Sequence, residues 1–156
     1  MTMAGVHDKQ FPNGNHRVAV VASHFSEAIS RRLLEPCLKE LIRLGVDKGN
    51  ITVVWVPGSF EIPLVASKLA KKKSVDCVIC LGAVIQGETL HFDLICRAAS
   101  EGIAHVSLET GKPVIFGILT TYTMKQALQR SQPKGENKGK DAAVAAVSMI
   151  DLLKKI

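Results

Sequence analysis

Short apolar runs alternate four times with segments of helical periodicity, and this alternation constrains the fold more than any other feature. The runs cover residues 17–22, 51–56, 78–85 and 113–119. Stretches that are apolar throughout are typical of strands covered on both faces. Strands joined through helices form a parallel sheet with right-handed crossovers. We therefore predict an α/β protein: a three-layer α/β/α sandwich around a four-stranded parallel sheet.

The connecting segments carry the expected helical signals. Apolar residues recur on one helical face from Ile29 to Leu44, and Gly45 ends the pattern. Pro36 lies inside it and predicts a kink. Ser26 and Thr89 are candidate N-caps. Further helices are predicted over residues 64–70, 92–108, 124–128 and 142–153.

Composition and charge limit the classes of partner. The chain has 156 residues, 47% of them apolar, so we expect a polar tail over residues 1–15 and a single domain over 16–156. The net charge of +6 would suit nucleic acid, a membrane surface or small anions. The cations are dispersed, however, and the lysines at 71–73 and 154–155 suit helix ends. We expect neither a nucleic-acid nor a membrane partner.

The cysteines point to a reducing compartment. All four, Cys37, Cys77, Cys80 and Cys96, lie in apolar surroundings. Cys77 and Cys80 have the spacing of a metal or redox pair, but residues three apart on a strand face opposite sides. We therefore expect buried thiols, no metal, no cofactor and a cytoplasmic protein.

Unusual residues gather where the predicted strands end. Ligands of open parallel sheets bind outside the carboxyl ends of the strands. Phe25 follows the first strand and lies in a polar loop, which favours stacking on a flat ring over core packing. Residues 59–61 follow the second strand, although Ser59 and Glu61 would also serve as caps of the next helix. Residues 116–121 end the fourth strand, and Phe116, by its position in a strand, could equally belong to the core.

The junction after the third strand is the strongest candidate for chemistry. His91 lies at a helix N-terminus, where free amides and the helix dipole attract an anion and where an imidazole can transfer protons. An ordinary first-turn histidine is the competing interpretation. The amides of Gly87, Glu88 and Thr89 could cradle a phosphate or form only a tight turn. Three loop cations could add charge to such a site: Arg130, Lys134 and Lys138.

Four motifs together resemble the lumazine synthase family. They are PGSFEIP at residues 57–63, GAVIQGETLHFD at 82–93, FGILTT at 116–121 and KGENKG at 134–139. The resemblance runs from about Arg17 to the end of the chain, in order and with matching spacing. It implies a flavodoxin-like fold and the penultimate step of riboflavin biosynthesis.

That step condenses 5-amino-6-(D-ribitylamino)uracil with 3,4-dihydroxy-2-butanone 4-phosphate. The products are 6,7-dimethyl-8-ribityllumazine, phosphate and water. By resemblance, His91 transfers protons. The uracil substrate is bound by Phe25, Ser59, Phe60, Glu61, Ala83, Val84, Ile85, Phe116 and Lys138. The butanone phosphate is bound by Gly87, Glu88, Thr89, Arg130 and Lys134.

The resemblance also implies an assembly. Members of the family form pentamers, and twelve pentamers can build a hollow icosahedral shell; riboflavin synthase is a further implied partner. Phe116 and Arg130 would then reach a site shared with the adjoining subunit. Gln86, Pro133 and Glu136 depart from the commonest family pattern, and the last two alter the loop that carries Lys134.

Three other functions remain possible from the sequence. A non-catalytic flavin- or lumazine-binding protein of the same fold would need Phe25 but neither His91 nor Arg130. A nucleic-acid-binding domain would need a continuous cationic face. A purely structural shell protein would not need polar residues at the strand ends.

Overall fold

Four parallel strands form the sheet in the computed structural model, which describes residues 15–156. Their order is β2-β1-β3-β4, and their bounds are β1 Val18–Ser23, β2 Ile51–Val56, β3 Cys77–Ile85 and β4 Val114–Thr121. The predicted tail lies outside the described residues except for its last position. The parallel sheet confirms the predicted α/β class.

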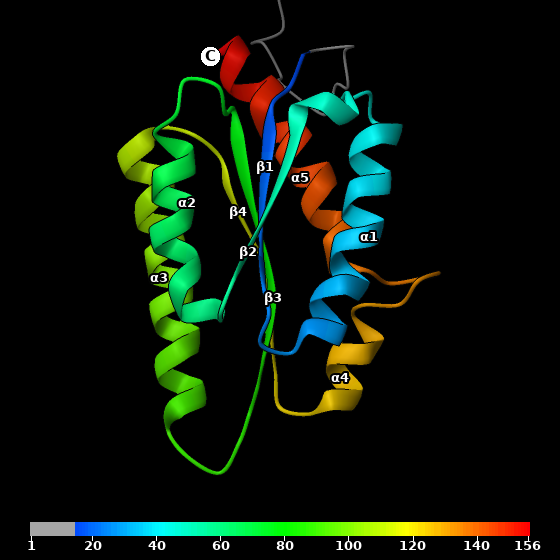
Figure 1. The fold of residues 1–156 in the computed structure, drawn as a ribbon, viewed down its shortest axis with the longest axis vertical. Helices are drawn as coiled ribbons and strands as arrows, with labels where there is room; N and C mark the ends of the chain where they lie inside the picture. The colour runs from blue at the N-terminus through cyan, green and yellow to red at the C-terminus, as the bar shows by residue number, and fades with distance from the viewer. Residues whose placement is uncertain (1–14) are drawn as a thin grey trace, which may run out of the picture.

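Helices cover both faces of this sheet. Figure 1 shows α2 (Ile62–Ala70) and α3 (His91–Thr110) on one side, and α1 (Glu27–Arg43) and α5 (Lys138–Lys155) on the other. The short α4 (Met124–Gln129) follows β4, and two 3-10 turns, η1 (Lys48–Asn50) and η2 (Ser59–Glu61), flank β2. The three-layer sandwich is therefore confirmed. No helix of the part described is long and apolar enough to cross a membrane.

Alternating side chains of the central strands build two separate cores. Val18 and Val20 of β1 pack on the α1–α5 side, whereas Ala19 and Val21 pack on the α2–α3 side. Cys77 and Cys80 divide in the same way, as predicted, so they cannot form one site.

Three of the four cysteines are buried thiols, as expected. Burial raises the pKa of Cys37 to about 12 and raises that of Cys80 further. Cys96 is only partly buried, so the prediction was wrong there. The reason is that α3 is covered by the molecule along one side only, and Cys96 lies at the border of that side.

The edge strands are less buried than predicted. Ile51, Val53, Val54 and Trp55 of β2 are half-buried and Thr52 is exposed. The physical reason is that β2 and β4 are the two edge strands. Within residues 15–156, β2 pairs with β1 alone and β4 with β3 alone.

Of the two predicted N-caps, Ser26 occupies the capping position and Thr89 does not. Ser26 precedes α1 with a left-handed backbone (φ 57°), and its side chain makes no capping hydrogen bond. α3 begins at His91, so Leu90, not Thr89, occupies the capping position. The Thr89 hydroxyl still accepts a hydrogen bond from the His91 amide at 3.3 Å. Pro36 lies within α1 as predicted.

Candidate active site

The carboxyl ends of the strands meet at the lower end of the molecule in Figure 1, next to the start of α3. A cavity of about 700 Å³ opens there between the connections that follow β1, β2 and β3. The predicted proton-transferring residue, His91, lines it. So do most of the residues predicted for the uracil and the phosphate: Phe25, Ser59, Phe60, Glu61, Ala83, Val84, Ile85, Gly87 and Thr89.

The β1–α1 connection presents Phe25 to this cavity. The Phe25 amide donates to the Pro57 carbonyl at 2.9 Å, and its own carbonyl accepts from the Ser23 hydroxyl at 3.1 Å. The Phe25 side chain is 72% exposed. An exposed ring held by its backbone can take a flat ligand on its face.

The β2–α2 connection contributes a buried hydroxyl. Ser59 is 5% exposed and lies in η2, ahead of the cap of α2. Glu61 occupies the N-cap position of α2, but its side chain makes no capping hydrogen bond. Gly82 of β3 passes close by: a Cβ there would lie 2.7 Å from the Ser23 oxygen and 3.0 Å from the Ser59 oxygen. The glycine therefore gives these two serines room at the back of the cavity.

The β3–α3 connection places His91 at the first position of a 20-residue helix. The Gln86 amide donates to the Thr121 carbonyl at 2.9 Å, which fixes the start of the connection to the end of β4. Gly87, Thr89 and His91 are exposed and line the cavity, and the positive end of the α3 dipole lies beside them. Glu88 is also exposed but does not line it.

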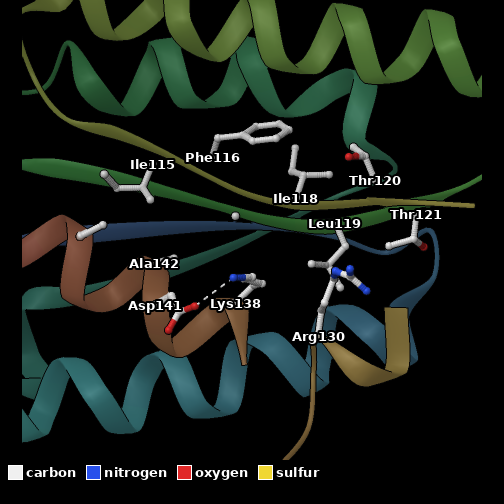
Figure 2. Close-up of a pocket in the computed structure, with 12 residues that line it drawn as sticks. Ile115, Phe116, Ile118, Leu119, Thr120, Thr121, Arg130, Lys138, Asp141 and Ala142 are labelled. Atoms are coloured by element: carbon white, nitrogen blue, oxygen red, sulfur yellow. Dashed lines mark hydrogen bonds and ion pairs between the residues drawn. The ribbon is translucent and has the colours of Figure 1, made fainter. Parts of the chain in front are cut away.

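A second cavity, of about 340 Å³, lies along β4. Phe116, Arg130 and Lys138 line it, together with neighbouring residues of β4 and α5. Figure 2 shows Phe116 on one side of the strand and the two cations on the other, so this group straddles the sheet edge. Phe116 is 43% exposed, so it is not the core residue that its place in a strand would suggest.

A tight loop fixes the two cations relative to each other. The Lys138 amide donates to the Arg130 carbonyl at 2.9 Å. Asn137 caps α5 by accepting from the Gly139 and Lys140 amides, and its own amide group donates to the Arg32 carbonyl at 3.0 Å. Sequence reasoning missed the capping role of Asn137, although an asparagine directly before a helical pattern is the usual signal.

Lys138 and Arg130 differ in how far acidic side chains neutralise their charge. The Lys138 ammonium lies 3.4 Å from Asp141 and 3.7 Å from Glu136. Half-buried Arg130 instead donates to the carbonyl of Gln126 at 3.1 Å, which leaves its charge available to an anion. Lys134 is exposed and lines neither cavity.

The family model of 6,7-dimethyl-8-ribityllumazine synthase matches residues 15–154. The chain belongs to this family. Lumazine synthases carry out the condensation that the four motifs implied, and the match covers nearly the whole of the chain.

In this lumazine synthase chain the predicted site is divided between the two cavities. They share no lining residue. The structure brings Phe25 and His91 together, but within one chain it does not add Phe116, Arg130 or Lys138 to them. In residues 15–156 no cluster of histidine, cysteine and acidic residues could hold a metal ion.

Proposed function

We propose that this lumazine synthase forms 6,7-dimethyl-8-ribityllumazine in a site that two adjacent subunits of a homo-oligomer share. The observation that carries the proposal is that the two cavities complement each other. The larger one offers a ring-stacking surface, amides at a helix start and a histidine, but among the described residues its lining includes no lysine or arginine. The smaller one offers cations and an aromatic ring at a free sheet edge. Within residues 15–156, the larger cavity has the histidine and the helix-start amides but no such cations, and the smaller cavity has the cations but neither the histidine nor these amides.

The uracil substrate would lie in the larger cavity. Phe25 stacks on its ring, Ser59 and the main chain of residues 83–85 hold its polar edge, and Phe60 and Glu61 contact the ribityl chain. Phe116 and Lys138 of the adjoining subunit close over the same substrate.

The phosphate of the second substrate would lie at the start of α3. The amides of Gly87, Glu88 and Thr89 face it together with the dipole of the helix. Arg130 of the adjoining subunit completes the anion site with charge-assisted hydrogen bonds, and Lys134 adds positive charge nearby.

The reaction needs proton transfer more than a strong nucleophile. The substrate amine attacks the ketone, and a first water leaves to give an imine. Elimination of phosphate leaves an enol, which tautomerises to a second carbonyl. The second amine attacks that carbonyl, and loss of a second water closes the ring. His91 accepts and returns the protons of these steps from the edge of the cavity. Holding the two substrates side by side supplies a further large share of the acceleration.

The assembly and its setting follow from the same proposal. A subunit that carries both halves of the site on different surfaces makes head-to-tail contacts, which close into a ring. We expect the pentamer of the family, alone or as twelve pentamers in a shell, in the cytoplasm, with riboflavin synthase as the enzyme that consumes the product.

The basic activity is tested by mixing the purified protein with both substrates. Lumazine absorbance should appear with time, and light scattering on the same sample gives the particle size. A protein that retains a yellow ligand but forms no lumazine would instead be a flavin- or lumazine-binding member of the fold.

Sharing of the site is tested by mixing two impaired variants and assaying them with the butanone phosphate well below the KM that Arg130→Ala shows for it. His91→Ala and Arg130→Ala subunits are unfolded together in equal amounts and refolded as mixed oligomers. About a quarter of the interfaces then combine an intact His91 half with an intact Arg130 half, so about a quarter of the wild-type activity should return. Mixtures that stay as impaired as their components would contradict the shared site.

A further inference from the structure

Phe25 is exposed to an unusual degree for a residue proposed to fix the position of a substrate. Its side chain is 72% exposed, so packing does not hold the ring. The position of the ring must therefore be set by the backbone of the β1–α1 connection and by the residues that contact this connection. The residue that follows, Ser26, has a left-handed backbone (φ 57°), which sets the direction in which the chain enters α1.

His24, directly before Phe25, is fixed in three ways. Its amide donates to the Val56 carbonyl at 2.8 Å. Its ring stacks on Trp55, with 4.9 Å between the ring centroids and an interplanar angle of 25°. Its Nδ1 lies 3.1 Å from Oε2 of Glu27. The residue that precedes the exposed ring is therefore tied both to the neighbouring strand and to the first turn of α1.

Trp55 completes a closed cycle of contacts. The Arg31 guanidinium lies 5.0 Å from the centroid of the Trp55 ring and 2.7 Å from Oε1 of Glu27. Hydrogen bonds from His24 and from Arg31 hold the pKa of Glu27 below its usual range, so its carboxylate stays charged near neutral pH. Trp55, His24, Glu27 and Arg31 each contact two other members of the cycle.

We infer that Trp55 and His24 are positioning residues that hold Phe25 in the orientation needed to stack on the uracil substrate. Neither of them lines the cavity. Trp55 directly precedes Val56 and Pro57 in the chain. The carbonyls of these two residues accept hydrogen bonds from the His24 and Phe25 amides. The inference rests on the proposed function, because it assumes that Phe25 meets the ring of the substrate.

A purely structural role for Trp55 makes a different prediction. The ring is half-buried and packs against the α1-side core, so its removal could simply weaken β2. Val53 provides the matched control, because it lies two residues earlier on β2, is also half-buried against that core and takes no part in the cycle. Val53→Ala weakens the strand without touching the connection that carries Phe25.

The first experiment measures amide hydrogen exchange without substrate. In Trp55→Leu, exchange at the His24 and Phe25 amides should speed up by about two- to tenfold, the equivalent of losing one aromatic pair. Trp55→Phe should restore most of the protection, and Val53→Ala should leave these two amides as protected as in the wild type. Unchanged exchange in Trp55→Leu would overturn the inference.

The second experiment is a double-mutant cycle on the kinetics. Trp55→Leu should raise KM for the uracil substrate by about two- to tenfold and leave KM for the butanone phosphate unchanged. Added to Phe25→Ala, it should have no further effect, because the residue that it positions is gone. Equal effects in both backgrounds, or an equal rise in both KM values, would show a structural role and overturn the inference.

The two experiments separate this inference from the proposed function. Hydrogen exchange needs no catalysis, so it tests the bracing of Phe25 directly. A wild-type protein that forms no lumazine would overturn the proposed function, whereas an active wild type with additive kinetics would overturn only the positioning role.

Discussion

His91 is the candidate acid–base residue, and its position leaves the imidazole accessible to a substrate. The sequence placed this histidine at a helix start, and the structure places it at the first position of α3, on the rim of the larger cavity. Its ring is exposed, so it can meet a substrate without displacing part of the protein.

Replacement of this imidazole should slow the chemical step. His91→Ala should lower kcat by up to about 10²–10⁴-fold, the range for loss of an acid–base group. The measurement is lumazine formation with both substrates saturating. His105→Ala is the control, because this exposed histidine lies on the same helix, paired with Glu109 at 3.8 Å and outside both cavities. Equal rates for the two variants would remove His91 from the mechanism.

The cations should differ in their effect on the phosphorylated substrate. Arg130→Ala should raise KM for the butanone phosphate by about 10–100-fold, as expected when a charge-assisted hydrogen bond is lost. Lys138→Ala should have a smaller effect on this KM, because Asp141 and Glu136 already neutralise the ammonium. Steady-state titration of each substrate at saturating partner gives both values. A larger effect at Lys138, or an equal loss for the uracil substrate in Arg130→Ala, would contradict the assignment.

Some residues of the candidate site could be placed from the sequence and others could not, for physical reasons. Phe25, Ser59 and His91 could be placed at one edge of the sheet because the carboxyl ends of parallel strands meet there. The separation of Phe116 and Arg130 from His91 could not be predicted from patterns. It depends on the strand register, which pairs Phe116 with Cys80 in the middle of β3, and on where the end of α4 places Arg130. The resemblance to lumazine synthases supplied that expectation instead.

At the scale of elements, alternation of apolar and helical segments was enough to predict the layers. It could not separate edge strands from central ones, because β2 is as apolar as β1 although it has only one neighbour. Two details of the helix caps could not be predicted either. The left-handed backbone of Ser26 and the one-residue shift at Thr89 depend on how each connection meets the sheet.

Close packing of α5 on α1 should depend on one glycine. A Cβ at Gly139 would collide with the backbone carbonyl of Leu33, which cannot move like a flexible side chain. Gly139→Ala should therefore lower the free energy of unfolding by roughly 2–4 kcal/mol, as overpacking does. Urea denaturation at one fixed protein concentration measures this, with Gly49→Ala as the control, where a Cβ meets its nearest atom at 3.8 Å. Equal midpoints for the two variants would refute the close approach.

The entrances of β1 and β3 should be coupled through a pH-dependent ion pair. Burial alone raises the pKa of Asp76, but hydrogen bonds from Arg17 outweigh it, and the pKa falls below the ordinary value of 3.8. Stability from this pair is therefore present above about pH 3.8 and is lost as the pH falls through the lower folded-state pKa. Asp76→Asn should lower the melting temperature at pH 7 and flatten its fall in acid.

The control for this pair is an exposed one. Glu35→Gln removes the partner of Lys39, and both side chains are more than two-thirds exposed. Solvent screening should make its effect on the melting temperature smaller than that of Asp76→Asn. The reverse order would show that the Arg17–Asp76 pair contributes little.

At the scale of the whole molecule, a chain that carries two unlike half-sites on different surfaces has a consequence for its kinetics. If adjacent subunits share the site as proposed, a subunit in isolation has no complete catalytic centre, and a ring of such subunits has as many centres as members. Activity per subunit should then depend on concentration, falling away once dilution separates the ring faster than it reforms. On this proposal oligomerisation is a requirement for catalysis, and the dissociation constant of the ring would set the lowest protein concentration at which the enzyme is active.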